Sequence, residues 1–583
     1  MTSIDDIFKK PLSSGNAKRK LTAEKNADEI YKSVKLNQNG HVRSNGQTTV
    51  EDEPEEDDDG YAGPGLPLDM EDEGADDEEG RFFGGGITSE TADVLDYLEE
   101  QDKGNMAIEK IDSAWLRKLA LNFERKISKN TELRAKFEGD PQRFMGSEAD
   151  LDAEIKALSI LSEHSELYRE FAQLGCVSSL VSLLAHENTD ISIDAIEIIS
   201  ELIDEDVDVE QAQWDAVVDA MLEANLLDLL AQNLSRFDEG NESDRNGVYH
   251  VLVVLESLAS RSSIAESICR ADLLLSQLLS RARKAESQVT QNKQYAAEVL
   301  AILLQSSSTN RVKFVEKDGI DQFLQLLSPY RKRDPAQGTD EEEFVENVFD
   351  CVICCVDDTP GKDKFLEAEG VELCLIMLKE GKMSRPRALR LLDHALGGLY
   401  GTSCCQKLVE AGGLKVLFTM FMKKHDKQTY EHLISIFASM FRLLPGDSAE
   451  RIRLLGKFVE KDYEKIARLF QLRKDYKMKV GVVDREIATE KSTLSTNEQE
   501  ENADEWLSRR LGAGLFSLQA IDVVLAWLVA EDDGAKSQIQ KLMGEKFGEI
   551  WKTLKEQLDS AADEEADEAA SLQDMLSTLI QFV

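Results

Sequence analysis

Three cysteines close together are the first residues in the sequence that could do chemistry. Cys351, Cys354 and Cys355 have a spacing that metal and redox sites use. They lie, however, inside FVENVFDCVICCV, an apolar stretch with the period of a helix, and no second cysteine pair has zinc-finger spacing. A buried cysteine usually acts as a small hydrophobic side chain. The sequence therefore predicts no metal site here and no cofactor.

Two further patterns resemble catalytic motifs but lack their context. Asp393 and His394 are adjacent on an expected helix, so their side chains diverge by about 100° and do not form an acid–base pair directly. The run Gly84-Gly85-Gly86 has no strand before it, and no phosphate-binding G-x-x-x-x-G-K-[ST] motif occurs. The sequence therefore predicts a protein that is not an enzyme and has no catalytic residue.

Carboxylates offer another chemistry, the electrostatic binding of a basic segment. The chain has 112 Asp and Glu against 68 Lys and Arg, a net charge of -44. Such a charge argues against nucleic acid as the main direct ligand and favours basic partners. Glu197 and Glu201 share one face of an expected helix, and Glu298 should lie two layers further along. Each exposed carboxylate would attract Lys or Arg by about 0.2 to 1 kcal/mol, although charge on a helix face can equally be an ordinary solvated surface.

The elements that must position these carboxylates are repeated pairs of helices. Residues 175–204 contain two apolar stripes at helical spacing, and neither stripe can be buried by its own hairpin. Similar helix starts recur every 40 to 50 residues or so, the mark of a helical solenoid, at Gly175, Asn225, Asp272, Gly319, Gly370 and Gly413. AAEVLAIL (296–303) and AIEIISEL (195–202) resemble the AAWALSNL pattern of the armadillo repeat.

These patterns predict an all-α, armadillo-like α-solenoid with helical caps and a disordered N-terminal tail. The predicted parts are a tail over 1–87, an N-terminal helical cap over 88–174, about six repeats over 175–450 and a C-terminal helical cap over 451–583. Ser147 with Asp150 three residues later suggests a capping box for the helix that follows. In armadillo proteins that clamp an extended peptide, the Trp and Asn of AAWALSNL form a ladder. That ladder is missing here, because Glu197 and Glu201, for example, stand in its place.

The tail divides into a basic and an acidic segment. Residues 1–50 hold a candidate nuclear localisation signal, formed by Lys9, Lys10, Lys18, Arg19 and Lys20. Residues 51–80 contain sixteen Asp or Glu and no Lys or Arg, which is typical of a solubilising linker or of a histone-chaperone tail. The sequence shows no secretory signal and no apolar run of membrane-spanning length, and its cysteines fit a reducing compartment.

Several segments resemble the β-catenin-like family of nuclear armadillo proteins. They are LNFERKISKNTELRAKF (121–137), RFMGSEADLDAEI (143–155), HENTDISI (186–193), AEVLAILLQ (297–305), ENVFDC (346–351), LDHAL (392–396) and RRLGAGLFSLQ (509–519). The resemblance implies a nuclear, non-catalytic scaffold, an accessory component of the spliceosome-associated nineteen complex that takes part in pre-mRNA splicing by binding basic segments of splicing proteins. It places the candidate peptide-binding groove at Glu197, Glu201, Glu298 and Asn347. Some relatives self-associate through N-terminal helices, so residues 88–170 are expected to be able to do so.

Two other functions remain open from the sequence. One is a nuclear transport adaptor, which would bind a carrier and shuttle, and the missing Trp and Asn ladder counts against it. The other is an acidic histone-type chaperone that acts through residues 51–80. No membrane partner and no direct nucleic-acid partner are expected.

Overall fold

The computed structural model describes residues 110–561 and 567–583, which belong to one compact unit, Phe83–Val583. Three predicted features lie outside the described residues: the disordered tail with its localisation signal, the acidic segment 51–80, and residues 88–109 of the N-terminal cap. The proposed division into caps and repeats, and self-association through residues 88–170, stay predictions.

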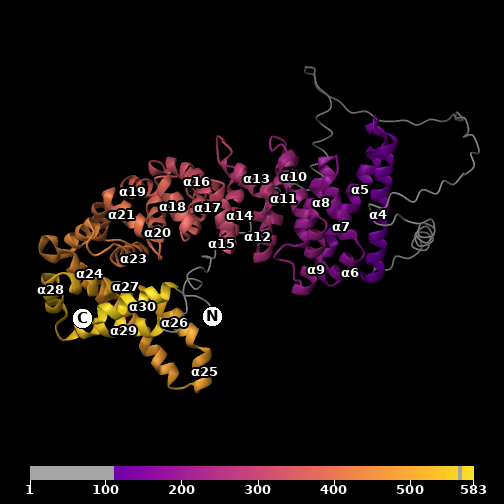
Figure 1. Ribbon diagram of the computed structural model, residues 1–583. Helices are drawn as coiled ribbons and strands as arrows, with labels where there is room; N and C mark the ends of the chain where they lie inside the picture. Colours follow the sequence, from indigo (N-terminus) through magenta and orange to yellow (C-terminus); the bar gives the residue numbers. More distant parts are fainter. Residues whose placement is uncertain (1–109, 562–566) are drawn as a thin grey trace, which may run out of the picture. The chain divides into compact units, whose positions relative to one another are not determined.

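Every regular element in the described ranges is a helix (Figure 1). Six long helices follow one another, each packed against the next, and are called the long-helix ladder: α8 (Thr189–Leu202), α11 (Glu242–Ala259), α14 (Gln291–Ser306), α17 (Asp340–Cys355), α20 (Ser384–Leu396) and α23 (Lys427–Leu443). Shorter helices complete the layers: α7 (Cys176–Ser182), α9 (Gln211–Glu223), α10 (Leu226–Arg236), α12 (Ser262–Arg270), α13 (Asp272–Arg283), α15 (Ser308–Glu316), α16 (Gly319–Leu327), α18 (Thr359–Glu367), α19 (Gly370–Glu380), α21 (Thr402–Glu410) and α22 (Gly413–Phe421).

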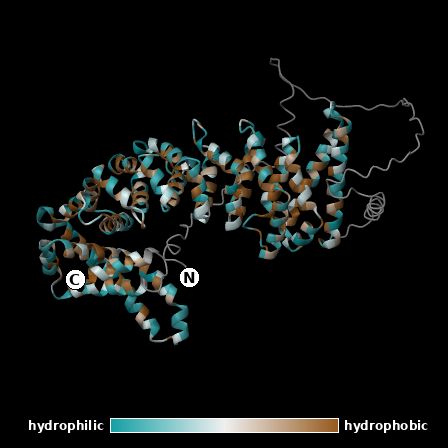
Figure 2. Cartoon of the chain, in the orientation of Figure 1, coloured by the Kyte–Doolittle hydropathy of each residue, from teal (hydrophilic) through white to brown (hydrophobic). Residues whose placement is uncertain are grey.

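The apolar stripes that predicted this arrangement are buried. In the first pair of helices they are Val177, Leu180, Val181, Leu184, Ile191, Ala195, Ile198, Ile199 and Leu202. Figure 2 shows apolar residues running as stripes along the helices, with polar residues on their other sides. Because each stripe is covered by a neighbouring helix pair, the layers share one continuous core. The predicted all-α helical solenoid is therefore confirmed.

Left-handed residues mark most repeat starts. Gly175, Asn225, Asp318, Glu369 and Gly412 have φ of 80°, 61°, 55°, 54° and 76°, and each precedes a short helix. The predicted starts Gly319 and Gly370 lie one residue after the left-handed position. They must be glycine for another reason: a Cβ would lie 2.4 Å from the Phe314 ring and 2.2 Å from the Phe365 ring.

The helices before the repeats are α4 (Ser113–Lys136), α5 (Met145–Ala157) and α6 (Tyr168–Gln173), and the predicted capping box at Ser147 is wrong. Ser147 lies inside α5, where its hydroxyl donates to Phe144 O at 2.7 Å and accepts from Asn130 Nδ2 at 3.1 Å. Asp150 instead accepts from Lys126 at 3.1 Å. The serine is therefore a buried contact with α4, not a helix start.

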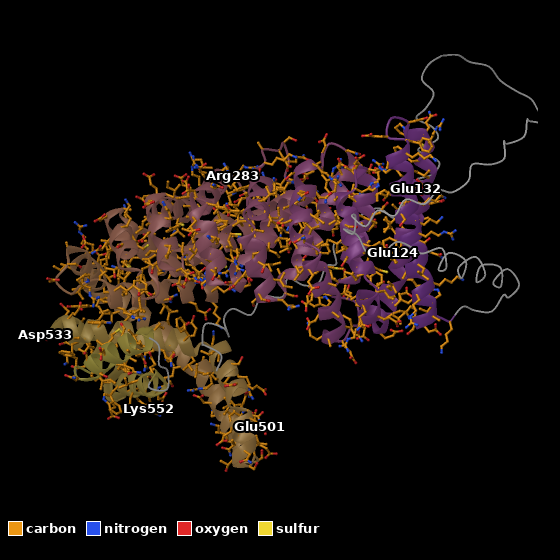
Figure 3. All side chains as sticks on the ribbon, turned by 45° about the vertical axis from the view of Figure 1, so that its right-hand side comes forward. Glu124, Glu132, Arg283, Glu501, Asp533 and Lys552 are labelled. Atoms are coloured by element: carbon orange, nitrogen blue, oxygen red, sulfur yellow. The ribbon has the colours of Figure 1, made fainter. Side chains whose placement is uncertain are left out.

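The C-terminal part consists of α24 (Ala449–Lys491), α25 (Thr496–Glu501), α26 (Ala503–Gly512), α27 (Leu515–Glu531), α28 (Asp533–Met543), α29 (Gly548–Ala561) and α30 (Asp567–Ile580). α24 is two helical segments joined by a kink, since Lys461, Asp462 and Tyr463 have φ of 59°, 53° and 59°. α27 packs against α23 and so continues the ladder. Glu501 is the last residue of α25, next to the turn that leads to α26 (Figure 3). Taken singly, none of the helices described is long and apolar enough to cross a membrane, and only the bent pair α26 and α27 reaches that length and hydropathy together.

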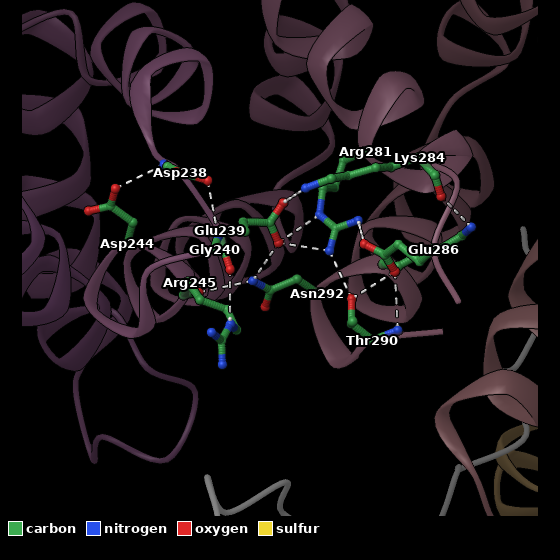
Figure 4. A network of polar contacts seen from close by, with 11 residues as sticks. Asp238, Glu239, Gly240, Asp244, Arg245, Arg281, Lys284, Glu286, Thr290 and Asn292 are labelled. Atoms are coloured by element: carbon green, nitrogen blue, oxygen red, sulfur yellow. Dashed lines mark hydrogen bonds and ion pairs between the residues drawn. The ribbon is translucent and has the colours of Figure 1, made fainter. Parts of the chain in front are cut away.

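A buried ionic network holds the connections before α11 and α14 (Figure 4). The Glu239 carboxylate accepts from Arg281 Nε at 2.9 Å and from Asn292 Nδ2 at 3.2 Å. Arg281 also donates to Glu286 at 2.9 Å, and the side chains of Glu239, Arg281 and Glu286 are only 12%, 10% and 14% exposed. This network fixes the first turn of α14, the helix that carries Glu298.

Candidate functional site

The predicted groove residues lie on consecutive helices of the ladder. Glu197 and Glu201 are on α8, Glu298 is on α14 and Asn347 is on α17, and all four are half-buried. α8 packs against α11, α11 against α14 and α14 against α17, so Glu298 is two helices from α8, as expected. The structure thus places the four residues along one series of packed helices, with α11 between the two glutamates of α8 and Glu298.

His250 on α11 lies beside the two glutamates of α8. Its Nε2 is 4.0 Å from Glu197 Oε1, and its Nδ1 is 3.3 Å from the Ser200 hydroxyl. Burial lowers the pKa of His250 to about 4, although the charge of Glu201 opposes that shift. The imidazole is therefore neutral at pH 7 and does not offset the carboxylates.

Glu256 and Tyr295 bridge the step from α11 to α14. The Tyr295 hydroxyl donates to Glu256, and the Tyr249 ring lies 5.4 Å from the Tyr295 ring, centre to centre. One turn after Tyr295, Glu298 accepts from Gln294 Nε2 at 2.9 Å. Glu197, Glu201, Glu256 and Glu298 are together called the acidic face.

On α11 the Trp and Asn positions of the armadillo pattern fall on Val253 and Ser257, so that pattern does not mark His250 and Glu256. The signal was nevertheless in the sequence. His250 and Glu256 lie three residues before and after Val253, so all three share one stripe of the helix.

The helices of the acidic face carry almost no cations. α8 contains no Lys or Arg, α11 has none after Arg245 and α14 has none after Lys293. Lys293 is itself buried and donates to Lys284 O at 2.7 Å. Burial raises the pKa of Glu197, because partial removal from water makes the ionised carboxylate less stable. A cation supplied by a ligand would stabilise that carboxylate.

An acidic hollow adjoins the first helix of the acidic face. It has a volume of about 470 Å³, lies between α5 and α8, and its carboxylates are those of Glu148, Asp152, Asp190 and Asp194. Lys156 is its one lysine, and its Nζ is 3.4 Å from Asp194 Oδ1. Burial, helped by a hydrogen bond with Asp152, raises the pKa of Asp194 to about 8. Asp194 and Asp152 therefore hold a proton between them at neutral pH.

Asp194→Asn is expected to stabilise the protein at pH 8 and to flatten its pH dependence. Between the ordinary aspartate pKa and about pH 8, the folded protein holds a proton that the unfolded chain releases, so stability falls as pH rises. The amide removes this loss, a gain of about 1 to 3 kcal/mol at pH 8 and little at pH 4. Urea unfolding midpoints at both pH values measure it. The exposed control Asp228→Asn should change neither midpoint, and an equal shift in both variants would contradict the prediction.

The acidic face ends at α17 because α20 supplies arginines. Arg390 Nη1 lies 3.0 Å from Asp350, and Arg387 pairs with Glu346, so these two carboxylates of α17 already have cationic partners. Asn347 stands between these two pairs in the sequence, on the side of α17 next to the pairing. The glutamates of the acidic face therefore lie on α8, α11 and α14.

Asp393 and His394 on α20 pair with residues outside that helix, on α23 and in the turn after α17. Asp393 accepts from His432 Nδ1 at 2.9 Å, and His394 Nδ1 lies 2.9 Å from Asp357. Asp393 and His394 thus have different partners, which agrees with the expectation that adjacent residues on a helix do not pair with each other.

The cysteines lie in the core of α17. Cys351 and Cys355 are buried, burial raises the pKa of both thiols, and Cys351 Sγ donates to Ala297 O at 3.6 Å. Across residues 110–561 and 567–583, no group of three or more His, Cys, Asp or Glu side chains is arranged to hold a metal ion.

Comparisons with known proteins identify the family. Residues 92–559 match the family described as "Catenin-beta-like, Arm-motif containing nuclear". Beta-catenin-like protein 1 homolog of Schizosaccharomyces pombe is 41% identical over 471 residues, which cover 81% of this chain and 82% of that protein. Beta-catenin-like protein 1 of Homo sapiens is 37% identical over 430 residues, 71% of this chain and 76% of that protein. Among solved structures, a designed armadillo repeat protein in complex with the peptide (KR)4 is 14% identical with a TM-score of 0.36, covering 45% of this chain and 99% of that protein. The family model and the relatives show that the helical solenoid is of the armadillo type and that the chain belongs to the catenin-beta-like family of armadillo-motif nuclear proteins.

Proposed function

We propose that this protein is a nuclear, non-catalytic scaffold that binds basic peptide segments of splicing proteins, as an accessory component of the spliceosome-associated nineteen complex. The acidic face carries the proposal, because it gathers four glutamates on three packed helices that supply almost no cations. The nuclear part is supported by the family's description, and the splicing part by the resemblance of the sequence segments.

The acidic face suits an extended chain with several Lys or Arg. Each partly exposed carboxylate contributes only about 0.2 to 1 kcal/mol, so affinity must come from several contacts along the peptide. The net charge of -44 also draws a basic segment toward the surface and speeds association. Beyond α14, the side-chain amide of Asn347 can both donate to and accept from a peptide backbone.

Reversing the charge of three glutamates should abolish most of the binding. We expect Glu197→Lys, Glu201→Lys, Glu298→Lys to weaken binding of a fluorescein-labelled, lysine- and arginine-rich peptide by at least about tenfold, because three attractions become repulsions. Fluorescence anisotropy at 0.05 M and 0.15 M salt measures the change, which should shrink as salt rises.

The matched control makes the same charge change away from the long-helix ladder. Glu223, Asp363 and Glu410 are exposed on α9, α18 and α21, and the variant in which all three are Lys should bind within about twofold of the native protein. Equal losses in both triple variants would mean that net charge alone attracts the peptide, and the acidic face would then not be the site.

The splicing assignment has its own test. The tagged full-length chain and the triple variant Glu197→Lys, Glu201→Lys, Glu298→Lys are used for pull-downs from nuclear extract. The captured proteins are identified by mass spectrometry. We expect splicing proteins with basic segments on the native chain and their loss from the variant. If both recover the same splicing proteins, the binding surface lies elsewhere; if neither recovers any, the splicing role is wrong.

Deleting residues 51–80 separates the alternatives. An acidic histone-type chaperone would lose most of its affinity for histones without that segment, whereas the acidic face would keep its affinity for the basic peptide. A transport adaptor would instead recover an import or export carrier in the pull-down.

A further inference from the structure

One concave site on this acidic protein has five Lys or Arg side chains in its lining. It is a hollow of about 550 Å³ between the loop after α22, the start of α23 and the second segment of α24. The hollow is called the basic pocket here. Its basic lining residues are Lys423, Lys424, His425, Lys427, Arg468 and Lys479. Asp475 is the one acidic residue of its lining, and that carboxylate accepts from Gln471 Nε2 at 3.0 Å. The lining thus opposes the charge of the rest of the chain.

Tyr430 holds the pocket in a fixed shape. Its hydroxyl donates to Lys423 O at 2.6 Å and accepts from His425 N at 3.3 Å, which fixes the loop after α22. The same hydroxyl accepts from Arg468 Nη2, and the guanidinium carbon of Arg468 lies 5.2 Å from the centre of the Tyr430 ring. Because Arg468 and the loop are held by one buried tyrosine, little ordering is left for a ligand to induce.

Two nitrogen atoms of this pocket are buried without a hydrogen-bond partner. They are Arg468 Nε and His425 Nε2, on residues that both line the hollow. The Nε–H group of Arg468 lacks an acceptor, which destabilises the folded state, so an acceptor brought by a ligand is favoured. Arg468 also carries a positive charge. The acceptor that best satisfies it is therefore an anionic oxygen.

We infer that the basic pocket binds an anionic side chain, a carboxylate or a phosphate, carried by a segment of a partner protein. A nucleic acid would need a cationic track that follows several phosphates, whereas these cations converge on one hollow of a chain with net charge -44. Met422, Leu472 and Tyr476 add apolar surface to the lining, which suits the side chains that flank an acidic residue in a peptide. This inference concerns α23 and α24 and does not depend on the acidic face.

Peptide binding to the full-length protein tests the inference. Three labelled peptides of one sequence differ at a central serine that is phosphorylated, replaced by glutamate or left unmodified among neutral neighbours, and a single-stranded RNA of similar length is the fourth ligand. We expect the phosphorylated or the glutamate peptide, or both, to bind at least about tenfold more tightly than the neutral one. Preference between those two shows whether phosphate or carboxylate is the natural group.

The variant Lys424→Glu, Lys479→Glu reverses two exposed lysines of the pocket, which are not among the hydrogen-bond partners of the Tyr430 hydroxyl. It should lose at least about tenfold in affinity for the anionic peptides. The control Lys382→Glu, Lys415→Glu changes exposed lysines outside the pocket and should bind as the native protein does. A second variant, Arg468→Gln, should bind the anionic peptides more weakly, with circular dichroism showing that the fold is kept.

Four outcomes would overturn the inference. They are equal affinity for the anionic and neutral peptides, equal losses in the pocket and control variants, tighter binding of the RNA than of any peptide, and binding of inorganic phosphate with no binding of either anionic peptide.

Discussion

Asp522→Ala is expected to lower the free energy of unfolding of the C-terminal helices by about 3 to 5 kcal/mol. Asp522 is fully buried in α27, and its two oxygens lie 2.5 Å from Arg473 Nε and 3.1 Å from Arg473 Nη2. Arg473 belongs to α24 and its side chain is only 4% exposed. Without the aspartate, a guanidinium would remain buried with only Glu549, 3.4 Å away, as a carboxylate partner. The loss therefore comes mainly from the uncompensated charge.

Urea unfolding followed by far-ultraviolet circular dichroism measures this effect. Asp533→Ala, at an exposed position on α28, serves as control and should change stability by less than about 0.5 kcal/mol. The double variant Arg473→Met, Asp522→Leu should recover most of the lost stability, because replacing both members of a buried ion pair by apolar residues is often neutral. If Asp522→Ala unfolds at the same urea concentration as the control, the ion pair contributes nothing and the prediction is wrong.

The repeated layers could be predicted because each layer has its own apolar stripe at helical spacing in the sequence. The apolar stripe of a helix such as α14 recurs at a fixed spacing, whatever the neighbouring layers contain. Two of the glycines at the predicted repeat starts also indicated helix starts, although the physical reason for glycine there is not a left-handed backbone. Gly319 and Gly370 follow phenylalanines five residues earlier, and it is the approach of those rings, not a positive φ at the glycine, that excludes a side chain.

Local motifs and pairs of distant residues were harder to predict. Ser147 matched a capping box, yet the same serine and acid spacing also fits a helix whose serine is buried against a neighbour. Asp522 was visible in the sequence as a break in the apolar stretch of α27, but its partner Arg473 is 49 residues away. No periodic pattern links two such residues, so only the packing of α24 on α27 reveals the pair.

The candidate sites illustrate the same difference. Aligning the repeats located Glu197, Glu201 and Glu298, because equivalent positions in a solenoid lie on equivalent faces. The basic pocket had no such signal, since it joins the loop that holds Lys424 to Arg468 and Lys479, which come from a different helix. The net charge of -44 predicts basic ligands for the chain as a whole, although a small cationic hollow can exist on an acidic chain.

Arg451→Ala should have an effect of similar size, about 3 to 5 kcal/mol, on the junction between the long-helix ladder and the C-terminal helices. The Arg451 side chain is 2% exposed, and its Nε lies 3.1 Å from both oxygens of Glu531 at the end of α27. It also donates to Phe441 O in the last turn of α23, and its guanidinium carbon is 4.6 Å from the Phe441 ring centre and 4.5 Å from that of Trp527. One side chain thus joins α23, α24 and α27.

Arg451→Lys should recover less than half of that stability, since lysine has no planar group to stack between two rings or to donate to carboxylate and carbonyl together. Thermal unfolding and limited proteolysis of residues 444–448, between α23 and α24, measure the two variants, with the exposed Arg453→Ala as control. We expect faster cleavage in Arg451→Ala, because a helix end that loses its donors opens more often. Full recovery by lysine would show that charge alone holds the junction, and unchanged cleavage in both variants would show that Arg451 does not hold it.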